Sequence, residues 1–384
     1  MLLSDDHRAV QDAVRAFVQA EIAPHAAAWD KSHQFPAAQL KGLAALGCYG
    51  VAVPTEYDGA GLDYLALALL LEEVAAGDGG TSTVVSVNNC PVCSILMAFG
   101  TEAQKQRFLK PLARGDMLGA FCLTEPHVGS EAGGLKTTAV RVAGAGNGAD
   151  GDGYLINGVK QFITSGKNGD LAIVMAVTDK AAGKRGISAF LVPTATPGYT
   201  VARIEDKMGQ HSSDTAQILF DNCRIPAANR LGDEGQGLKI ALSGLEGGRI
   251  GIAAQALGMA RAAFEVALAY SKERRSFGVP IFEHQAVQFK LADMATKIEA
   301  ARQLIWHAAS LKDAGRPCLK EAAMAKLMAS EMAEAVCSGA IQVLGGYGYV
   351  SDFPVERIYR DVRVCQIYEG TSEVQKILIG RALA

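Results

Sequence analysis

The hydrophobic pattern changes its period twice along this chain of 384 residues, and that change constrains the fold more than any other feature. From Asp5 to about Arg114 the apolar residues recur with helical spacing. From about 118 to 231 the chain instead shows short β-branched runs, separated by clusters of Gly, Asn, Asp and Pro. Beyond 232 the helical spacing returns, so the sequence predicts a multidomain α+β protein.

We therefore predict a helical domain over 1–117, a compact β-barrel or sandwich over 118–231 and a helical bundle over 232–384. An Asn157-Gly158 pair between two β-like runs predicts a hairpin turn. In the last part, apolar residues step by three and four through three long stretches, which predicts an antiparallel four-helix bundle. The expected strands are 138–142, 154–156, 161–164, 171–177, 187–192, 199–204 and 216–220.

Composition argues against several classes of protein. The 37 basic and 40 acidic residues are nearly balanced, so nothing favours binding to nucleic acid. The longest continuous apolar run, Tyr64 to Leu71, is too short to cross a membrane. The first residues lack the pattern of a secretory signal or transit peptide, so we expect a cytoplasmic protein.

The eight cysteines are expected to be reduced core thiols, because they are scattered among apolar neighbours. Cys90 and Cys93 have redox spacing, but the chain has no second ligand pair that would complete a zinc site. We predict no metal site.

A stretch near the end of the chain, 367–375, places a carboxylate, a glycine and two hydroxyls in a row. Such residues suit a turn that opens a helix, with Thr371 or Ser372 as its cap and Glu369 projecting from the turn. Taken alone, the stretch could equally be an ordinary polar turn before a last helix.

Two motifs in the β-rich part carry residues suited to a flat, phosphorylated ligand. In 121–131 a strand leads into a loop where Gly129-Ser130 could approach a phosphate closely, although a plain surface turn is the alternative. In 156–166, Phe162 and Thr164 are two apart and share one strand face. They could stack on and hydrogen-bond a heterocycle, or simply belong to a half-buried strand.

Two further motifs lie in the last third. Arg274 and Arg275 end a helix before Gly278 and could hold a pyrophosphate, although a helix carboxyl end also favours arginine. The run 342–348 has paired glycines after a long helix, which could be no more than its C-cap.

Together, these five motifs in this order resemble the FAD-dependent acyl-CoA dehydrogenases over essentially the whole chain, and most closely the short-chain and short-branched-chain members. The resemblance implies an N-terminal α domain, a middle β-barrel and a C-terminal helical bundle, assembled as a homotetramer. It also implies FAD, held between the β domain and the C-terminal helices and completed by a neighbouring subunit.

The resemblance assigns Glu369 as the catalytic base. Some relatives carry the base immediately before the arginine that matches Arg249, but this chain has Gly248 there. The implied FAD contacts are Phe121, Leu123, Thr124, Gly129, Ser130, Phe162, Thr164, Arg274, Phe277, Gln285, Gln342, Leu344, Gly345, Gly346, Thr371 and Glu373. The implied substrate contacts are Ser130, Glu246, Gly247, Gly248, Arg249, Tyr368 and Gly370, with Glu246 either a substrate contact or a solvated carboxylate.

The implied activity is dehydrogenation of a short straight or branched acyl-CoA to the trans-2-enoyl-CoA. Glu369 would abstract the α proton, flavin N5 would take the β hydride, and an electron-transfer flavoprotein would receive the electrons. A free Glu, with a pKa of about 4, is a weak base, so burial is expected to raise the pKa of Glu369. The alternatives are an oxidase or other flavin enzyme of the same fold that reacts with oxygen, and a scaffold without flavin.

One departure from the family pattern is His127-Val128, where the family commonly has Gly and another small residue. His127 is expected to be a solvated loop residue rather than a catalytic one. The acyl chain length is left open, because one methylene changes binding by only about 1–3 kcal/mol.

Overall fold

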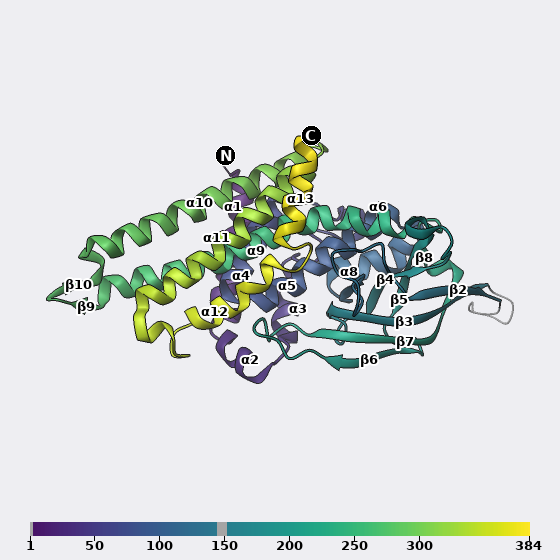
Figure 1. Ribbon diagram of the computed structural model, residues 1–384, viewed down its shortest axis with the longest axis horizontal. Coiled ribbons are helices and arrows are strands. Elements are labelled where there is room, and N and C mark those ends of the chain that lie inside the picture. The colour runs from purple at the N-terminus through teal and green to yellow at the C-terminus, as the bar shows by residue number, and fades with distance from the viewer. Residues whose placement is uncertain (1–2, 144–151) are drawn as a thin grey trace.

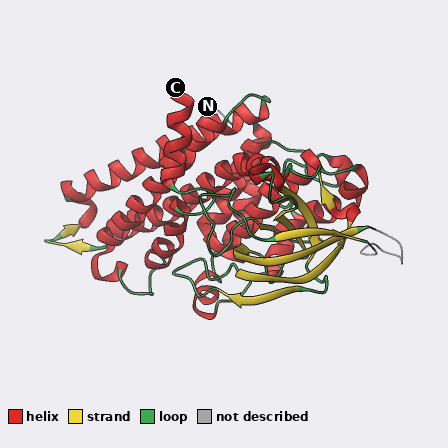
Figure 2. Ribbon diagram, turned by 45° about the vertical axis from the view of Figure 1, so that its right-hand side comes forward, coloured by secondary structure: helices red, strands yellow, loops and turns green. Residues whose placement is uncertain are grey.

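The computed structural model describes residues 3–143 and 152–384. The strands of the main sheet gather at one end of the molecule, and helices form most of the rest (Figures 1 and 2). The predicted order of helices, sheet and helices is confirmed.

The first part is helical, and four of its helices begin at a side-chain cap, which is Ser4, Asp63, Asp78 or Thr101. Ser4 accepts a hydrogen bond from the His7 amide, and Asp63 and Asp78 cap the next helices in the same way. These elements are α1 (Asp5–Phe17), α2 (Ala26–Ser32), α3 (Ala37–Ala45), α4 (Tyr64–Gly77), α5 (Gly79–Val87), α6 (Ser94–Phe99), α7 (Glu102–Gln104) and α8 (Lys110–Arg114), with short turns η1 (Val18–Ile22), η2 (Thr55–Tyr57), η3 (Asn88–Cys93) and η4 (Lys105–Leu109).

The second part is one eight-stranded sheet in the order β6-β7-β3-β2-β4-β5-β8, with β1 also paired to β4. Strand β1 runs parallel to β4 from Gly119 to Cys122, and β2 meets the same edge of β4 further along. The strands are β1 (Gly119–Cys122), β2 (Thr138–Val142), β3 (Gly153–Thr164), β4 (Leu171–Val177), β5 (Ile187–Pro193), β6 (Tyr199–Ile204), β7 (Thr215–Pro226) and β8 (Arg230–Leu231), with turns η5 (Gly183–Gly186) and η6 (Ala227–Asn229).

The predicted hairpin at Asn157-Gly158 is wrong. Both residues lie inside the continuous strand β3, which pairs with β2 on one side and β7 on the other. The pairing register shifts between Ile156 and Gly158, and Gly158 has a φ of 149°. The local turn preference of Asn-Gly is therefore absorbed as a β-bulge, because two neighbouring strands hold the segment extended.

The last part is built on three long helices, as predicted, and two shorter ones pack against α11. These elements are α9 (Gly237–Glu273), β9 (Arg275–Ser276), β10 (Val279–Pro280), η7 (Ile281–Glu283), α10 (Gln285–Asp313), α11 (Leu319–Leu344), η8 (Gly345–Gly348), α12 (Val355–Val362), η9 (Arg363–Gln366) and α13 (Ser372–Leu383). Strands β9 and β10 form the tip of the α9–α10 hairpin, at the end of the molecule opposite the sheet (Figure 1).

Buried ion pairs join the first and last parts. Glu72 and Glu73 on α4 are almost fully buried, and arginines from three helices reach them. Arg261 on α9 contacts both carboxylates, Arg302 on α10 contacts Glu72, and Arg15 on α1 contacts Glu73. Buried charges require such partners, so these pairs fix how α4 lies against α9 and α10.

All eight cysteines are buried and form no disulfide, which confirms the expected core thiols. Two helical stretches, Gly79–Phe99 and Gly237–Glu273, are long and apolar enough to cross a membrane. In their most apolar windows, 72% and 61% of the residues are buried inside the protein, as in the core helices of soluble proteins. The expected absence of a membrane span stays a prediction.

Candidate active site

Glu369 lies in a tight turn between η9 and α13. Its φ is 52° and that of Gly370 is 93°, so two successive residues adopt left-handed backbone conformations. The Thr371 hydroxyl then caps α13 by accepting a hydrogen bond from the Val374 amide at 3.4 Å, as predicted. A left-handed conformation costs a residue other than glycine about 1–2 kcal/mol, so the surrounding structure must hold this turn.

Three helices supply those restraints. The Tyr368 hydroxyl donates to Gln255 Oε1 on α9 at 2.7 Å. On the other side of Glu369, the Gly370 carbonyl accepts hydrogen bonds from Lys326 Nζ on α11 at 2.7 Å and from Gln375 Nε2 on α13 at 2.8 Å. The residues that flank Glu369 are thus anchored independently.

The Glu369 carboxylate faces the backbone of α9. Its Oε2 atom is buried, and no residue that the structure describes hydrogen-bonds it. A Cβ atom placed on Gly248 would lie only 2.0 Å from Oε2. The carboxylate therefore occupies the space that a side chain at 248 would need, which agrees with the choice of Glu369 over position 248 as the base.

Burial raises the pKa of Glu369 to about 7, while Arg249 and Lys326 act in the opposite direction. Arg249 is buried next to this turn, and its Nε and Nη1 atoms have no partner among the described residues. Burial lowers the pKa of Arg249, and it lowers that of Lys326 to about 8. The site thus combines a carboxylate that titrates near neutral pH with polar groups left free for a ligand.

Three other predicted substrate contacts are packed, ion-paired or hydrogen-bonded within the chain. Gly247 is packed closely against Tyr64 and Cys90. The Glu246 carboxylate is part-buried, 3.2 Å from Lys312 Nζ, so it is ion-paired rather than freely solvated. The Tyr368 hydroxyl is committed to Gln255, which gives that side chain a positioning role in the turn.

The loop after β1, which holds the predicted contacts Leu123, Thr124, Gly129 and Ser130, is tied to β3. The Gln161 amide donates to the Thr124 carbonyl at 2.9 Å. Lys160, fully buried, donates to Glu125 Oε1 at 2.8 Å and to the Leu123 carbonyl at 3.1 Å. Phe121, the third residue of β1, is partly buried.

His127 is an exposed loop residue, as expected, and its Nε2 atom lies 3.5 Å from Glu125 Oε2. Gly129 and Ser130 are exposed, and a Cβ atom on Gly129 would meet nothing within 4 Å. The loop is therefore held by hydrogen bonds to β3 at its start and has open space around Gly129, so a ligand can approach its backbone closely.

Phe162 projects from β3 at a second register shift, with a φ of 58° and 62% of its surface exposed. Ile163 is buried and Thr164 is half-buried, so Phe162 and Thr164 are both turned away from the core that Ile163 enters. An exposed aromatic ring with a nearby hydroxyl fits the predicted contact with a flat ring system.

A distant group of predicted contacts lies near the α9–α10 hairpin. Phe277 is 94% exposed, and Gln285 is also exposed. Arg274 lies over the Tyr347 ring at 5.8 Å, which places the 342–348 run beside the base of the hairpin. Gln342, Gly345 and Gly346 are exposed, Leu344 is buried, and Thr371 and Glu373 open α13.

Outside the Glu369 turn, the structure therefore places the predicted FAD contacts in two separate groups. Phe162 and the loop after β1 belong to the sheet, whereas the hairpin tip formed by β9 and β10 lies at the opposite end of the molecule (Figure 1). A Cβ atom on Gly346 would meet nothing within 4 Å, whereas Gly345 has a φ of 60°, a conformation that favours glycine. Both groups fit contact with an extended ligand.

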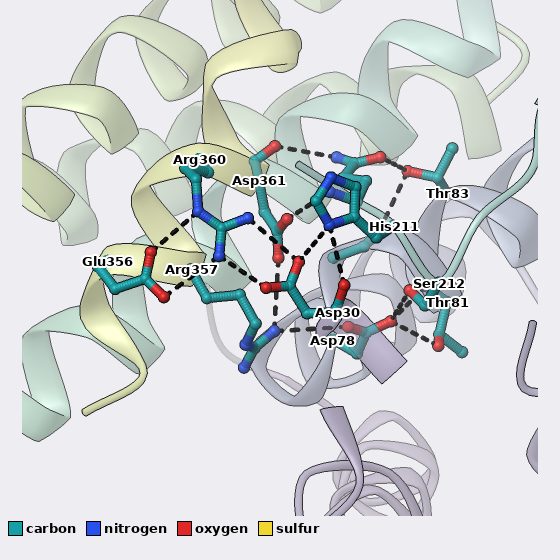
Figure 3. Close-up of polar contacts among 12 residues, drawn as sticks. Asp30, Asp78, Thr81, Thr83, His211, Ser212, Glu356, Arg357, Arg360 and Asp361 are labelled. Carbon is teal, nitrogen blue, oxygen red and sulfur yellow. Dashed lines mark hydrogen bonds and ion pairs between the residues drawn. The ribbon is translucent and has the colours of Figure 1, made fainter. Parts of the chain in front are cut away.

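A buried polar network surrounds α12 (Figure 3). Arg357 contacts Asp78 and Asp361, and Arg360 pairs with Asp30 on α2 at 2.6 Å. Asp361 also accepts a hydrogen bond from the Gln210 amide, and Gln210 accepts one from Thr83. Gln255 bonds both Thr83 and Tyr368, which links this network to the residue before Glu369.

The sequence analysis missed Lys326, Gln255 and Gln375, which hold the turn. One signal was available for Lys326. It stands among Ala322, Ala329 and Ala333 at helical spacing, so a lysine on the buried stripe of α11 marks an interior charge.

Of the described side chains, His33, Asp206 and His211 come close enough for a metal, with ligand atoms within 4.8 Å of one another. Both ring nitrogens of His211, however, lie within hydrogen-bond distance of the Asp30 and Lys207 carbonyl oxygens, at 3.0 and 2.6 Å. These hydrogen bonds account for the position of the His211 ring in this cluster.

Comparison with known proteins agrees with this geometry. The acyl-CoA dehydrogenase N-terminal, middle and C-terminal domain families match residues 4–116, 120–223 and 235–384. The human mitochondrial short-chain specific acyl-CoA dehydrogenase is 48% identical over 377 residues, which cover 98% of this chain and 90% of that protein.

Two solved structures are similar along the whole chain. Butyryl-CoA dehydrogenase from Megasphaera elsdenii has a TM-score of 0.95 and 42% identity, covering 100% of this chain and 99% of that one. A chain from a structure described as the electron transferring flavoprotein of Acidaminococcus fermentans has a TM-score of 0.96 and 46% identity, with the same coverage. The chain belongs to the acyl-CoA dehydrogenase family, whose members are FAD-dependent oxidoreductases acting on CH–CH groups.

Proposed function

We propose that this enzyme dehydrogenates short straight or branched acyl-CoA thioesters to trans-2-enoyl-CoA, with Glu369 as the base. The observation that carries the proposal is the Glu369 carboxylate, which is buried against Gly248 without a hydrogen bond to Oε2 and has a pKa of about 7. A general base works best when its pKa lies near the operating pH. Glu369 therefore has the environment that abstraction of an α proton requires.

Bound FAD supplies the hydride acceptor, which no side chain can provide. Phe162, Thr164, Thr124 and Ser130 would hold its ring and pyrophosphate. The left-handed backbone at Gly370 lets the main chain approach a ligand closely, and we assign the Glu369 amide to the thioester oxygen. The turn then provides both the base and a donor for the charge that develops on that oxygen.

The names of the relatives guide the choice of substrate and partner. Similar proteins are named for short-chain acyl-CoA and butyryl-CoA, and a similar chain comes from work on an electron transferring flavoprotein. We propose a short acyl-CoA as substrate and an electron-transfer flavoprotein as the acceptor.

We further propose a homotetramer in which the hairpin of one subunit completes the FAD site of another. Phe277 is almost fully exposed at a tip that points away from the same chain's sheet. An open cavity of about 440 Å³ at the base of this hairpin is lined by Arg274, Tyr270 and Phe353, among others. Exposed aromatic and arginine side chains of this kind are typical of interfaces.

Replacing Glu369 with Gln tests the proposal, because Gln keeps the size of the side chain and cannot accept the proton. With butyryl-, isobutyryl-, 2-methylbutyryl- and octanoyl-CoA and an artificial electron acceptor, the native enzyme should turn over the short substrates. The variant should retain FAD and lose turnover with all four. An unchanged rate with butyryl-CoA would refute the assignment of the base, and rapid peroxide formation by the native enzyme would favour an oxidase.

A further inference from the structure

A lysine is buried beside the turn that carries the proposed base. Lys326 lies in the middle of α11 with no exposed surface, among buried alanines. A lysine is almost never fully buried unless its ammonium group is paired. Its Nζ atom donates a hydrogen bond of 2.7 Å to the carbonyl of Gly370, which is 44 residues away in the sequence.

That hydrogen bond acts on the strained part of the turn. Gln375 Nε2 donates to the same Gly370 carbonyl at 2.8 Å, so donors from α11 and α13 converge on one acceptor. Together they fix the orientation of the peptide group that follows Glu369. Without them, the left-handed Glu369 could relax to an ordinary φ, and its carboxylate would turn away from Gly248.

The charge of Lys326 also reaches the carboxylate. Titratable groups from five elements surround this turn. The cations are Arg249 on α9 and Lys326 on α11, and the other groups are Cys90 on η3, Cys365 on η9 and Glu373 on α13. Burial raises the pKa of both thiols, which stay neutral near pH 7. Glu373 is exposed, and its backbone amide and the Thr371 hydroxyl lower its pKa. Arg249 and Lys326 are therefore the two cations that act on Glu369.

We propose that Lys326 is a positioning residue for the base: it holds the Gly370 carbonyl and thereby fixes the turn that directs Glu369. This role rests on the proposed function, because it presumes that Glu369 accepts the proton. Lys326 is committed to the backbone and does not touch the reacting atoms, so it acts through Glu369.

The first test is Lys326→Met in the FAD-loaded enzyme, which keeps the length of the side chain and removes both its charge and its donors. We expect kcat with butyryl-CoA to fall roughly 10- to 100-fold because the base is misplaced. The acid limb of kcat/KM should move up by about one pH unit or more, because a cation near the carboxylate is lost. KM should change much less than kcat.

Ser330→Ala is the matched control, since Ser330 is buried one turn further along the same face of α11 and its hydroxyl donates to the Leu327 carbonyl on the same helix. It should leave the pH profile unchanged. Lys326→Gln separates the two roles and serves if the Met variant does not fold. Gln can still donate to the carbonyl, so it should recover part of kcat while the acid limb stays displaced.

A direct titration distinguishes this inference from the proposed function. In pH-difference infrared spectra, the carboxylic-acid band of Glu369 is assigned by its loss in Glu369→Gln. In Lys326→Met that band should persist to higher pH than in the native enzyme. If the native enzyme shows no dehydrogenation, the proposed function fails while the infrared test still stands. A folded, FAD-loaded Lys326→Met enzyme with native kcat, acid limb and titration would overturn the role of Lys326.

Discussion

Glu369 combines two features that each cost free energy, a left-handed backbone and a buried carboxylate. Strained residues and perturbed carboxyl groups both cluster at functional sites, because the surrounding structure is needed to maintain them. Their coincidence in one residue supports its assignment as the base more strongly than the motif around it does. The same features give the residue a defined pH dependence.

We predict that kcat/KM for butyryl-CoA is low in acid, rises with pH through about 7 and then levels off, because only ionised Glu369 accepts a proton and its pKa is raised to about 7. Initial rates across pH, with the stability of the enzyme checked at each point, measure this limb. A midpoint near 4, the ordinary value for Glu, would show that the carboxylate is solvated in the free enzyme.

Gly248 gives a second prediction at this scale. In Gly248→Ala the new Cβ would lie 2.0 Å from Glu369 Oε2, which no structure tolerates, so the carboxylate must move. We expect kcat to fall roughly 10- to 100-fold, as measured by steady-state kinetics. Gly380→Ala on α13 is the control, because its Cβ would meet nothing within 4 Å, and it should keep native kcat. Native activity in Gly248→Ala would contradict the position of the carboxylate.

The family resemblance was enough to propose Glu369 as the base and to single out Gly248, because both lie in motifs that match the family. Lys326 could not be predicted in the same way. Its role depends on a hydrogen bond to Gly370, 44 residues away, and an alanine-rich helix does not reveal which turn it packs against. Tyr368 shows the same limit, since its hydroxyl serves the turn through Gln255.

At the scale of elements, strand β3 shows where local patterns fail. Short β-rich runs bounded by Gly, Asn, Asp and Pro clusters correctly predicted strands β4 and β6, whose bounds agree with the structure. In β3, however, an Asn-Gly pair that favours a hairpin is held extended by pairing with β2 and β7. The second register shift of β3, between Lys160 and Ile163, also releases Phe162 from regular pairing and leaves it exposed. Neither could be read from a single strand, because both depend on its neighbours.

The prediction for strand β3 concerns the ion pair of Lys160. Burial by itself would raise the pKa of Glu125, but the ammonium of Lys160 keeps that pKa below its usual value. Lys160→Met removes the partner of a buried carboxylate and should lower the free energy of unfolding by about 3–5 kcal/mol. Glu125→Gln/Lys160→Met should recover part of that loss. Urea unfolding of the three proteins measures both effects.

Glu125 also accepts hydrogen bonds from the amides of Lys136 and Thr137, so it organises the loop after β1. FAD retention is therefore an independent measure of what the ion pair between Lys160 and Glu125 contributes. Lys160→Met should release FAD more readily than the double variant does. Equal stability and equal FAD affinity in Lys160→Met and the native enzyme would show that the ion pair does not fix this loop.

At the scale of the whole molecule, the three-part order was predictable, because hydrophobic period alone separates helices from strands. Hydrophobic period did not predict how the contacts of the site are distributed over the fold. Predicted FAD contacts lie both on the sheet and near the α9–α10 hairpin, whose tip is at the opposite end of the molecule (Figure 1). A single copy of this chain therefore presents one group of contacts where its own sheet cannot use it, which supports an assembly that pairs the hairpin of one copy with the sheet of another.

Phe277→Asn tests that assembly. Phe277 has a φ of 51°, and Asn tolerates this conformation, so the variant removes the ring without straining the tip. Because exposed aromatic residues often dominate interfaces, we expect the FAD dissociation constant to rise about tenfold or more, and the assembly to dissociate at higher protein concentration in analytical ultracentrifugation. Val140→Thr, which changes an exposed apolar residue on β2, should leave both unchanged. A monomeric native enzyme that binds FAD tightly would contradict the shared site.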